Sequence, residues 1–315
     1  MPEGFKVDVA KAIGSESTPE LVECNRRDYL LYALSVGVPD TELQWLYENA
    51  DNFGPLPTYP LSLLLKKDYD VNVFAERFGG KSKVPGESSI PGIPEYNLDC
   101  VVHGEQTLEV INPFPVLGGQ FRSTKKVIDV GDKGSGMVVT SVQDLYGAVD
   151  GIHYCRMQSK MFVRGYGGWN GPKGQSSPSY KPPKDKKPDA TVSFETGTHQ
   201  ALLYRLCGDF NPLHADPKVA QSVGLPMPIL HGLCSYGRCC HAVLSTFGNN
   251  DRYRFKSITA RFAFPVLPGQ TVDIDMWKVP HDANHFGVIF NARVGDRVVL
   301  NNGYVVLANE SASKL

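Results

Sequence analysis

The sequence has no long hydrophobic run and no excess charge of one sign. No apolar stretch reaches the roughly 18–20 residues that cross a bilayer, and the opening residues, MPEGFKVDVA, lack the apolar centre of a signal peptide. The 315 residues carry 32 basic and 33 acidic side chains, which gives a net charge of −1. The overall charge therefore predicts neither nucleic acid nor an anionic membrane as a partner.

Motifs for metals, disulfides and dinucleotides are also missing. The seven cysteines are an odd set without a C-x-x-C pair, which argues against a disulfide framework and against a zinc knuckle. Six of the eight histidines show no metal-ligand spacing: His103, His153, His199, His241, His281 and His285. No G-x-G-x-x-G follows a strand-like segment, so no dehydrogenase activity is predicted. We expect buried, reduced thiols and no metal.

The composition and the internal repeats of the sequence indicate a globular protein built from two similar halves. Apolar residues make up 42% and charged residues 21% of the chain, a composition typical of folded soluble domains. Three pairs of segments match in the same order: LLYALSVG (30–37) with LLYRLCGD (202–209), PLPTYPL (55–61) with PMPILHG (226–232), and FPVL (114–117) with FPVL (264–267). They predict a duplicated domain, with halves at 1–164 and 191–312 and a Gly/Pro/Lys-rich linker at 165–190.

The second half predicts two helices followed by four strands. Asp216 as N-cap, Pro217 at the first helical position and Gly224 as stop predict one short helix. Residues 232–248 place Leu233, Tyr236, Cys240 and Leu244 on one stripe, which predicts a helix with one buried face. Strands are predicted at 257–266, 269–279, 285–294 and 297–308, and in the first half at 106–116, 123–132, 136–146 and 152–165. The fold class is α+β.

The segment GDFNPLH (208–214) is the first candidate for chemistry. Pro212 disfavours helix at Asn211, so the segment is a shaped loop that could direct Asp209 and His214 into one cavity. A carboxylate and an imidazole within reach of one water form an acid/base pair near neutral pH, and the Asn211 amide could orient that water. The alternative is plain turn chemistry. The first half has Gly37 and Glu42 in place of the acid and the histidine. This favours a second half that carries the polar residues of the site and a first half that has lost them, called the stripped half.

The second candidate is the start of the predicted helix at Gly232. Unpaired N–H groups and the helix dipole can hold a developing oxyanion, such as that of a thioester carbonyl. Glycine permits a close approach, whereas the first half has Leu61 at the matching position. The neighbouring His231 is expected to pack or to form a local hydrogen bond, with catalysis as the less favoured alternative.

The carboxyl end reads Ser313-Lys314-Leu315. This tripeptide is the address read by the peroxisomal import receptor. We therefore expect a peroxisomal protein that binds this receptor. The alternative is a coincidental polar tail.

These motifs resemble those of a known family. YRLCGDFNPLHADP, PILHGLC and ARFAFPVLPGQTVDIDMW in the second half, with RRDYLLYALSVGV, VHGEQ and DKGSGM in the first, resemble the hydratase 2 (MaoC-like) proteins. The resemblance covers nearly the whole chain apart from its loops. It implies a double hot-dog fold, in which each half wraps a curved antiparallel sheet around a long helix, and pairing of chains as homodimers. It also implies that the first half accommodates bulky acyl tails.

The resemblance further implies reversible hydration of trans-2-enoyl-CoA to (3R)-3-hydroxyacyl-CoA in peroxisomal β-oxidation. Asp209 and His214 match the catalytic pair, Asn211 the water-positioning residue and Gly232 the oxyanion amide. We favour Asp209 as the base and His214 as the proton donor, although the two could exchange roles. No cofactor is expected, because coenzyme A is part of the substrate.

The phosphates of that substrate need cations, and the candidates are Arg238, Arg252, Arg254 and Lys256, each of which could instead be a solvated surface charge. Three rival functions remain: a hot-dog thioesterase, a dehydratase acting on carrier-protein thioesters, and a protein that binds acyl-CoA without turning it over. The sequence does not specify the acyl chain length or branching, nor the physiological direction.

Overall fold

The computed structural model of the chain describes residues 5–66, 90–96 and 100–310. The terminal tripeptide Ser313-Lys314-Leu315, predicted to be an import address, lies outside this range. The helices are α1 (Val9–Ala12), α2 (Arg26–Ser35), α3 (Leu43–Leu46), α4 (Pro60–Leu63), α6 (Gln200–Tyr204), α7 (Pro217–Ser222) and α8 (Gly232–Phe247). The strands are β1 (Glu20–Asn25), β2 (Val101–Val110), β3 (Gly118–Asp132), β4 (Gly136–Gly147), β5 (His153–Arg164), β6 (Ala190–Glu195), β7 (Phe255–Phe262), β8 (Thr271–Pro280), β9 (His285–Val294) and β10 (Arg297–Ala308).

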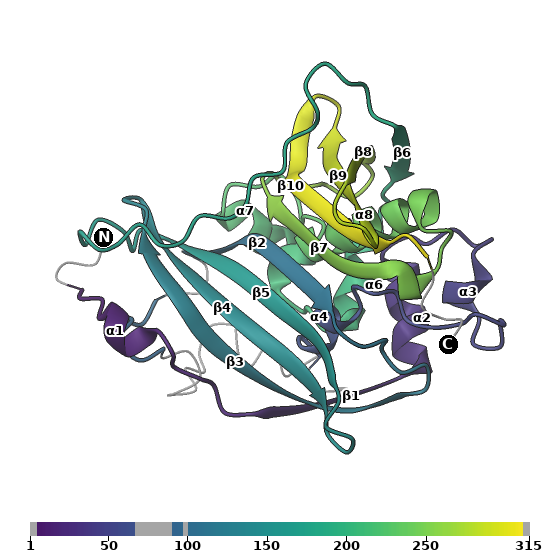
Figure 1. Cartoon of the computed structure of the whole chain (residues 1–315). Helices are drawn as coiled ribbons and strands as arrows, with labels where there is room; N and C mark the ends of the chain where they lie inside the picture. Colours follow the sequence, from purple (N-terminus) through teal and green to yellow (C-terminus); the bar gives the residue numbers. More distant parts are fainter. Residues whose placement is uncertain (1–4, 67–89, 97–99, 311–315) are drawn as a thin grey trace.

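All ten strands form one antiparallel sheet whose order shows the duplication (Figure 1). The order is β1-β3-β4-β5-β2-β7-β10-β9-β8-β6, so each half repeats the same strand sequence outward from the β2–β7 contact. At this contact Thr107 faces Thr259 across the ladder, and their hydroxyls lie 2.8 Å apart. The predicted α+β class is confirmed, and the sheet is the one expected of two hot-dog repeats.

The eight predicted strands are present, and two short ones were not predicted. β1 and β6 occupy the two ends of the sheet and pair only with β3 and β8, respectively. Both are six residues long. Their sequences, ELVECN and ATVSFE, are too short and polar to give a strong strand signal.

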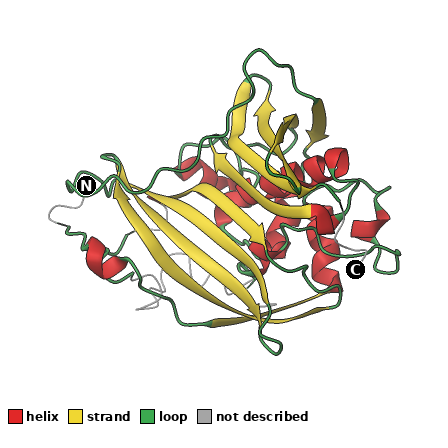
Figure 2. Cartoon of the chain, in the orientation of Figure 1, coloured by secondary structure: helices red, strands yellow, loops and turns green. Residues whose placement is uncertain are grey.

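Helix α8 is buried on all sides rather than on one face. Every residue from Cys234 to Leu244 is buried, so the prediction of a single buried stripe is wrong. The sheet covers part of the helix, and first-half residues cover more of it. A Cβ on Gly237 would lie only 2.6 Å from the Tyr32 hydroxyl of α2. Glycine thus lets the two halves approach closely at this point. Figure 2 shows most of the helices gathered on one side of the curved sheet, with α1 lying apart from them at the left.

The first half does not repeat the long helix within the described residues. Its counterpart of α8 is α4, a single turn that begins at Pro60. The residues from 67 to 89 lie outside the described range. At Gly237, α8 is packed by α2, whose Tyr32 hydroxyl also bonds Thr58 Oγ1 at 3.0 Å.

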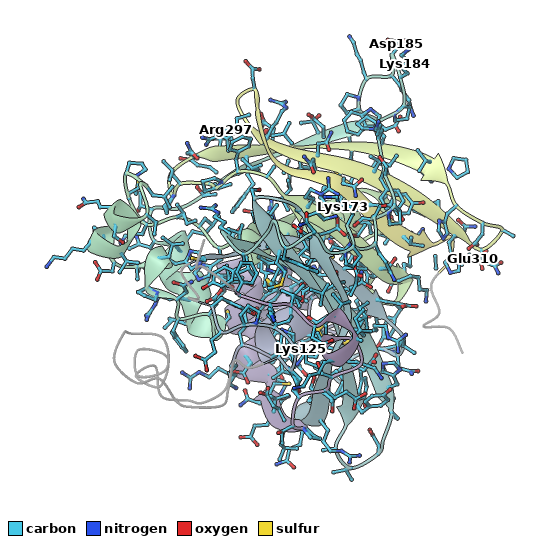
Figure 3. The ribbon with its side chains drawn as sticks, turned by 90° about the vertical axis from the view of Figure 1, so that its left-hand side faces the viewer. Lys125, Lys173, Lys184, Asp185, Arg297 and Glu310 are labelled. Atoms are coloured by element: carbon cyan, nitrogen blue, oxygen red, sulfur yellow. The ribbon has the colours of Figure 1, made fainter. Side chains whose placement is uncertain are left out.

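The segment predicted as a linker is irregular but well attached. No helix or strand occurs from Gly165 to Asp189. Gln175 N–H donates to Asp129, Tyr180 stacks on Tyr304 with ring centroids 4.1 Å apart, and Trp277 Nε1–H donates to the carbonyl of Lys186. Lys184 and Asp185 lie at its projecting tip (Figure 3). The segment is therefore a strap across the outer side of the sheet, and the domain limits drawn around it stay a prediction.

All seven cysteines are free, and six are buried, Cys100 being partly exposed. Within the described residues, no helix combines the length and apolarity needed to cross a membrane.

Candidate active site

The loop from Gly208 to His214 is held by both turn chemistry and the first half. Gly208 has φ +126°, and a Cβ there would lie 2.5 Å from the backbone nitrogen of Lys66, so only glycine fits at this turn. Asn211 Oδ1 accepts the N–H of Leu213 at 3.0 Å and caps a short 3₁₀ turn that starts at Pro212. The turn interpretation is therefore confirmed for this segment, and it does not exclude the site interpretation. The capping bond leaves the exposed Asn211 amide group free to orient a water.

His214 is held in one tautomer. Its Nδ1–H donates to the carbonyl oxygen of Ile229 at 2.8 Å. A carbonyl oxygen can only accept, so Nδ1 carries the proton and Nε2 carries a bare lone pair. Burial lowers the pKa of His214, while the nearby charge of Asp209 acts in the opposite direction. At neutral pH the ring is therefore a neutral base whose protonated form Asp209 stabilises.

Asp209 and His214 face the same space, together with a third residue. A ligand atom of Asp209, one of His214 and one of His231 all lie within 4.8 Å of one another. Asp209 Oδ1 accepts the N–H of Asn211 at 3.3 Å, which keeps the carboxylate turned back over the loop. The structure thus brings together the acid and the histidine that the sequence singled out.

His231 contacts both Asp209 and His214, which the sequence did not predict. Its Nε2–H donates to the backbone carbonyl of Asp209 at 3.0 Å, and its ring stacks on that of His214 with centroids 3.6 Å apart. Its side chain is 1% exposed. The sequence signal was its position directly before the helix start, which says nothing about ring stacking.

The same three side chains raise the question of a metal ion. They are two imidazoles and a carboxylate, a set that suits several transition metals. However, the planes of the two stacked rings differ by only 25°. Stacked rings present their lone pairs side by side, whereas coordination requires lone pairs that converge on one ion. The geometry therefore favours acid/base chemistry over metal binding.

Gly232 begins α8 and is exposed at the site. A Cβ at this position would meet the Phe262 ring at 2.8 Å, so the helix start is fitted closely against β7. The N–H groups of Cys234 and Ser235 both turn to the carbonyl of His231. Among the described residues none accepts the Gly232 N–H, which leaves it for a ligand. At the matching position of the first half, Leu61 is buried.

Arg238 is not available to a phosphate. Its side chain is buried in α8, its Nη1 lies 2.9 Å from both the Gly37 carbonyl and His241 Nδ1, and its guanidinium lies over the Phe194 ring. His241 in turn donates from Nε2 to Glu42 at 2.8 Å. The proposed coenzyme A contact is therefore corrected: Arg238 joins α8 to the stripped site of the first half.

The other three basic candidates lie beyond the opposite end of α8. This helix has 16 residues, so its ends are separated by about 24 Å. Arg254 donates to the carbonyls of Ala308 and Asn309, and Lys256 approaches the carbonyl of Tyr253. The structure does not bring Arg252, Arg254 or Lys256 to the helix start, and their contact with the phosphates of a long coenzyme A substrate stays a prediction.

Comparisons with known proteins agree with this geometry. Residues 22–165 match the family model of the MFE-2 hydratase 2 N-terminal domain, and residues 179–298 match that of the MaoC like domain. The chain is 35% identical over 304 residues to the probable enoyl-CoA hydratase 2 of Dictyostelium discoideum, covering 96% of this chain and 97% of that one. It is also 37% identical over 289 residues to the mouse peroxisomal multifunctional enzyme type 2, covering 90% of this chain but 36% of that one.

Solved structures give the same result. The MaoC-like dehydratase from Phytophthora capsici superposes with a TM-score of 0.84 at 35% identity, covering 97% of this chain and all of that one. A Mycobacterium tuberculosis protein described as a double hotdog fold superposes with a TM-score of 0.53 at 11% identity, a likeness of fold alone. The chain is a double hot-dog protein of the MaoC-like class. It belongs to the hydratase 2 family.

Proposed function

We propose that the chain is an enoyl-CoA hydratase 2, which reversibly adds water to trans-2-enoyl-CoA to give (3R)-3-hydroxyacyl-CoA. The observation that carries this proposal is the meeting of Asp209 and His214 with His231, the residue directly before the exposed start of α8. The names of the full-length relatives and the family models support the same reaction. The multifunctional relatives are much longer than this chain, so their other activities are not part of the proposal.

The water is activated between the two side chains. As its oxygen adds to C3, one proton passes to the bare Nε2 of His214, and the Asp209 carboxylate stabilises the imidazolium. His214 then returns a proton to C2, so that the pair ends in its starting state. This assigns His214 both proton transfers and Asp209 a supporting role, a modification of the division favoured from the sequence. Such acid/base catalysis contributes about 10²–10⁴-fold in rate.

The electron pair of the C2–C3 double bond moves toward the thioester oxygen during the addition. Gly232 N–H, at the positive end of α8, is positioned to hold the resulting oxyanion. No electrons leave the substrate, so the reaction needs no redox cofactor. Coenzyme A enters only as part of the substrate.

The experiment follows the ultraviolet band of the conjugated enoyl-thioester after purified protein is added to crotonyl-CoA or decenoyl-CoA. Loss of the band with formation of the 3R product, resolved on a chiral column, supports the proposal. Release of the free thiol of coenzyme A would instead support the thioesterase alternative. A stable band in the presence of bound substrate would support an acyl-CoA-binding protein without turnover. Faster reaction of a carrier-protein thioester than of the CoA thioester would support the dehydratase alternative.

We further propose that the protein acts in peroxisomal fatty-acid oxidation. Ser313, Lys314 and Leu315 supply the receptor-read address, and several relatives carry peroxisomal names. A fluorescent protein fused to the amino terminus should colocalise with a peroxisomal marker and become diffuse when the three residues are deleted.

A homodimer is proposed from the family resemblance. Light scattering during size-exclusion chromatography would give twice the 34.6 kDa mass of one chain if the proposal is right, and the mass of one chain if it is wrong. The acyl tail is proposed to extend toward the first half, which lacks the catalytic set.

A further inference from the structure

His231 is attached to both members of the catalytic pair in different ways. Its Nε2–H donates to the backbone carbonyl of Asp209, and its ring lies against the ring of His214. The first contact joins the residue before the helix start to a loop 22 positions away in the sequence. The second sets the plane of the imidazole that exchanges protons.

The ring of His231 is itself held in place. Tyr204 lies 4.8 Å from it between ring centroids, and the Tyr204 hydroxyl is 3.1 Å from Ser62 Oγ of the first half. The three aromatic rings of Tyr204, His231 and His214 therefore form a buried group attached to both halves of the chain. Packing of this kind restricts the rotation of each ring.

The charge state of His231 suits this position. Burial lowers the pKa of His231 well below its ordinary value, and the charge on His214 lowers it further. His231 therefore stays neutral when His214 carries the proton during turnover. A neutral ring stacked on an imidazolium is attractive, whereas two charged rings at this distance would repel each other.

We propose that His231 is a positioning residue of the hydration reaction. Its N–H fixes the main chain from which the Asp209 carboxylate projects, and its neutral ring fixes the plane of the His214 imidazole. Both effects keep the water within reach of the carboxylate and of Nε2 at once. This inference rests on the proposed hydratase function, and it adds a residue that acts through Asp209 and His214.

The test compares substitutions that separate the hydrogen bond from the ring. His231→Phe keeps a ring and removes the donor, and we expect kcat to fall about 10²-fold, as for a misplacement of about 1 Å, with little change in KM. The side-chain amide of His231→Gln can place an N–H close to the position of the histidine Nε2. We therefore expect kcat of the Gln variant to be at least about tenfold higher than that of the Phe variant. His231→Asn, one methylene shorter, should restore less. The Gln and Asn variants decide the question if the Phe variant does not fold.

The matched control is His241→Phe. His241 is also 1% exposed, and it also donates from Nε2 to an oxygen, that of Glu42, but it lies away from the loop. It should lower the melting temperature and leave kcat near that of the wild type. The proposal is overturned if His231→Phe retains kcat, if Gln and Asn are equally slow, or if the control loses as much activity. A wild type that fails to hydrate enoyl-CoA would refute the proposed function instead.

Discussion

Replacing Gly232 by alanine tests the role of the helix start. The new Cβ would lie 2.8 and 2.9 Å from two atoms of the Phe262 ring, and this ring cannot move freely because it also packs on His103, with centroids 4.7 Å apart. Overpacking of this kind costs about 1–3 kcal/mol of stability. The methyl group also keeps the thioester oxygen away from the N–H, and loss of one oxyanion donor lowers kcat by about 10²–10³-fold. Hydration of crotonyl-CoA and urea denaturation measure the two effects separately.

Gly237→Ala is the matched control for this prediction. Gly237 lies on the same helix, and its added Cβ would be 2.6 Å from the Tyr32 hydroxyl and 2.9 Å from Val36. The crowding is comparable, but the helix start is untouched. We expect a similar loss of stability with kcat close to that of the wild type. The reasoning is refuted if Gly232→Ala retains full activity, or if both variants lose activity in proportion to stability.

Three further predictions concern pH, the contact between the halves, and the loop. Burial lowers the pKa of His103 from 6.5 to about 4. The free energy of unfolding should therefore be highest above pH 6.5, and it should fall by up to about 3 kcal/mol as the pH drops toward 4, because the unfolded chain takes up the proton first. Urea denaturation at several pH values should show a smaller fall for His103→Gln, and an equal fall would contradict the assignment. Glu42→Gln should cost about 2 kcal/mol, because it removes the carboxylate charge that accepts the Nε2–H of buried His241, while kcat is unchanged; a loss of kcat without loss of stability would be inconsistent with this role. Asn211→Asp keeps the acceptor that caps Leu213 but loses the amide, so kcat should fall while the melting temperature stays the same, and unchanged kcat would remove Asn211 from the site.

Much of the fold could be predicted because the sequence repeats its signals. Apolar alternation identified eight strands, and Asp216, Pro217 and Gly224 marked a helix that the structure confirms, including the N-cap bond from Lys218 N–H. The complete burial of α8 could not be predicted. A single helix pattern shows which residues can be buried, but not that first-half residues such as Tyr32 would cover the other side.

In the site, too, local features could be predicted and contacts between distant segments could not. Asp209 and His214 are close in sequence and are held by a local turn, so their meeting could be predicted from GDFNPLH. The position of His231 depends on a contact between segments 22 residues apart, which local patterns do not specify. Arg238 was misassigned because charge suggests exposure, whereas here its Nη1 bonds Gly37 and His241 inside the protein.

The most direct measurement of the central claim is a double-mutant cycle on hydration with Asp209→Asn, His214→Ala and the two combined. If both side chains act on one water, each single variant should lose about 10²–10⁴-fold in kcat, and the double variant should be scarcely slower than the worse single one. Losses that multiply would show that the two residues act independently, and full activity in either single variant would contradict the shared site.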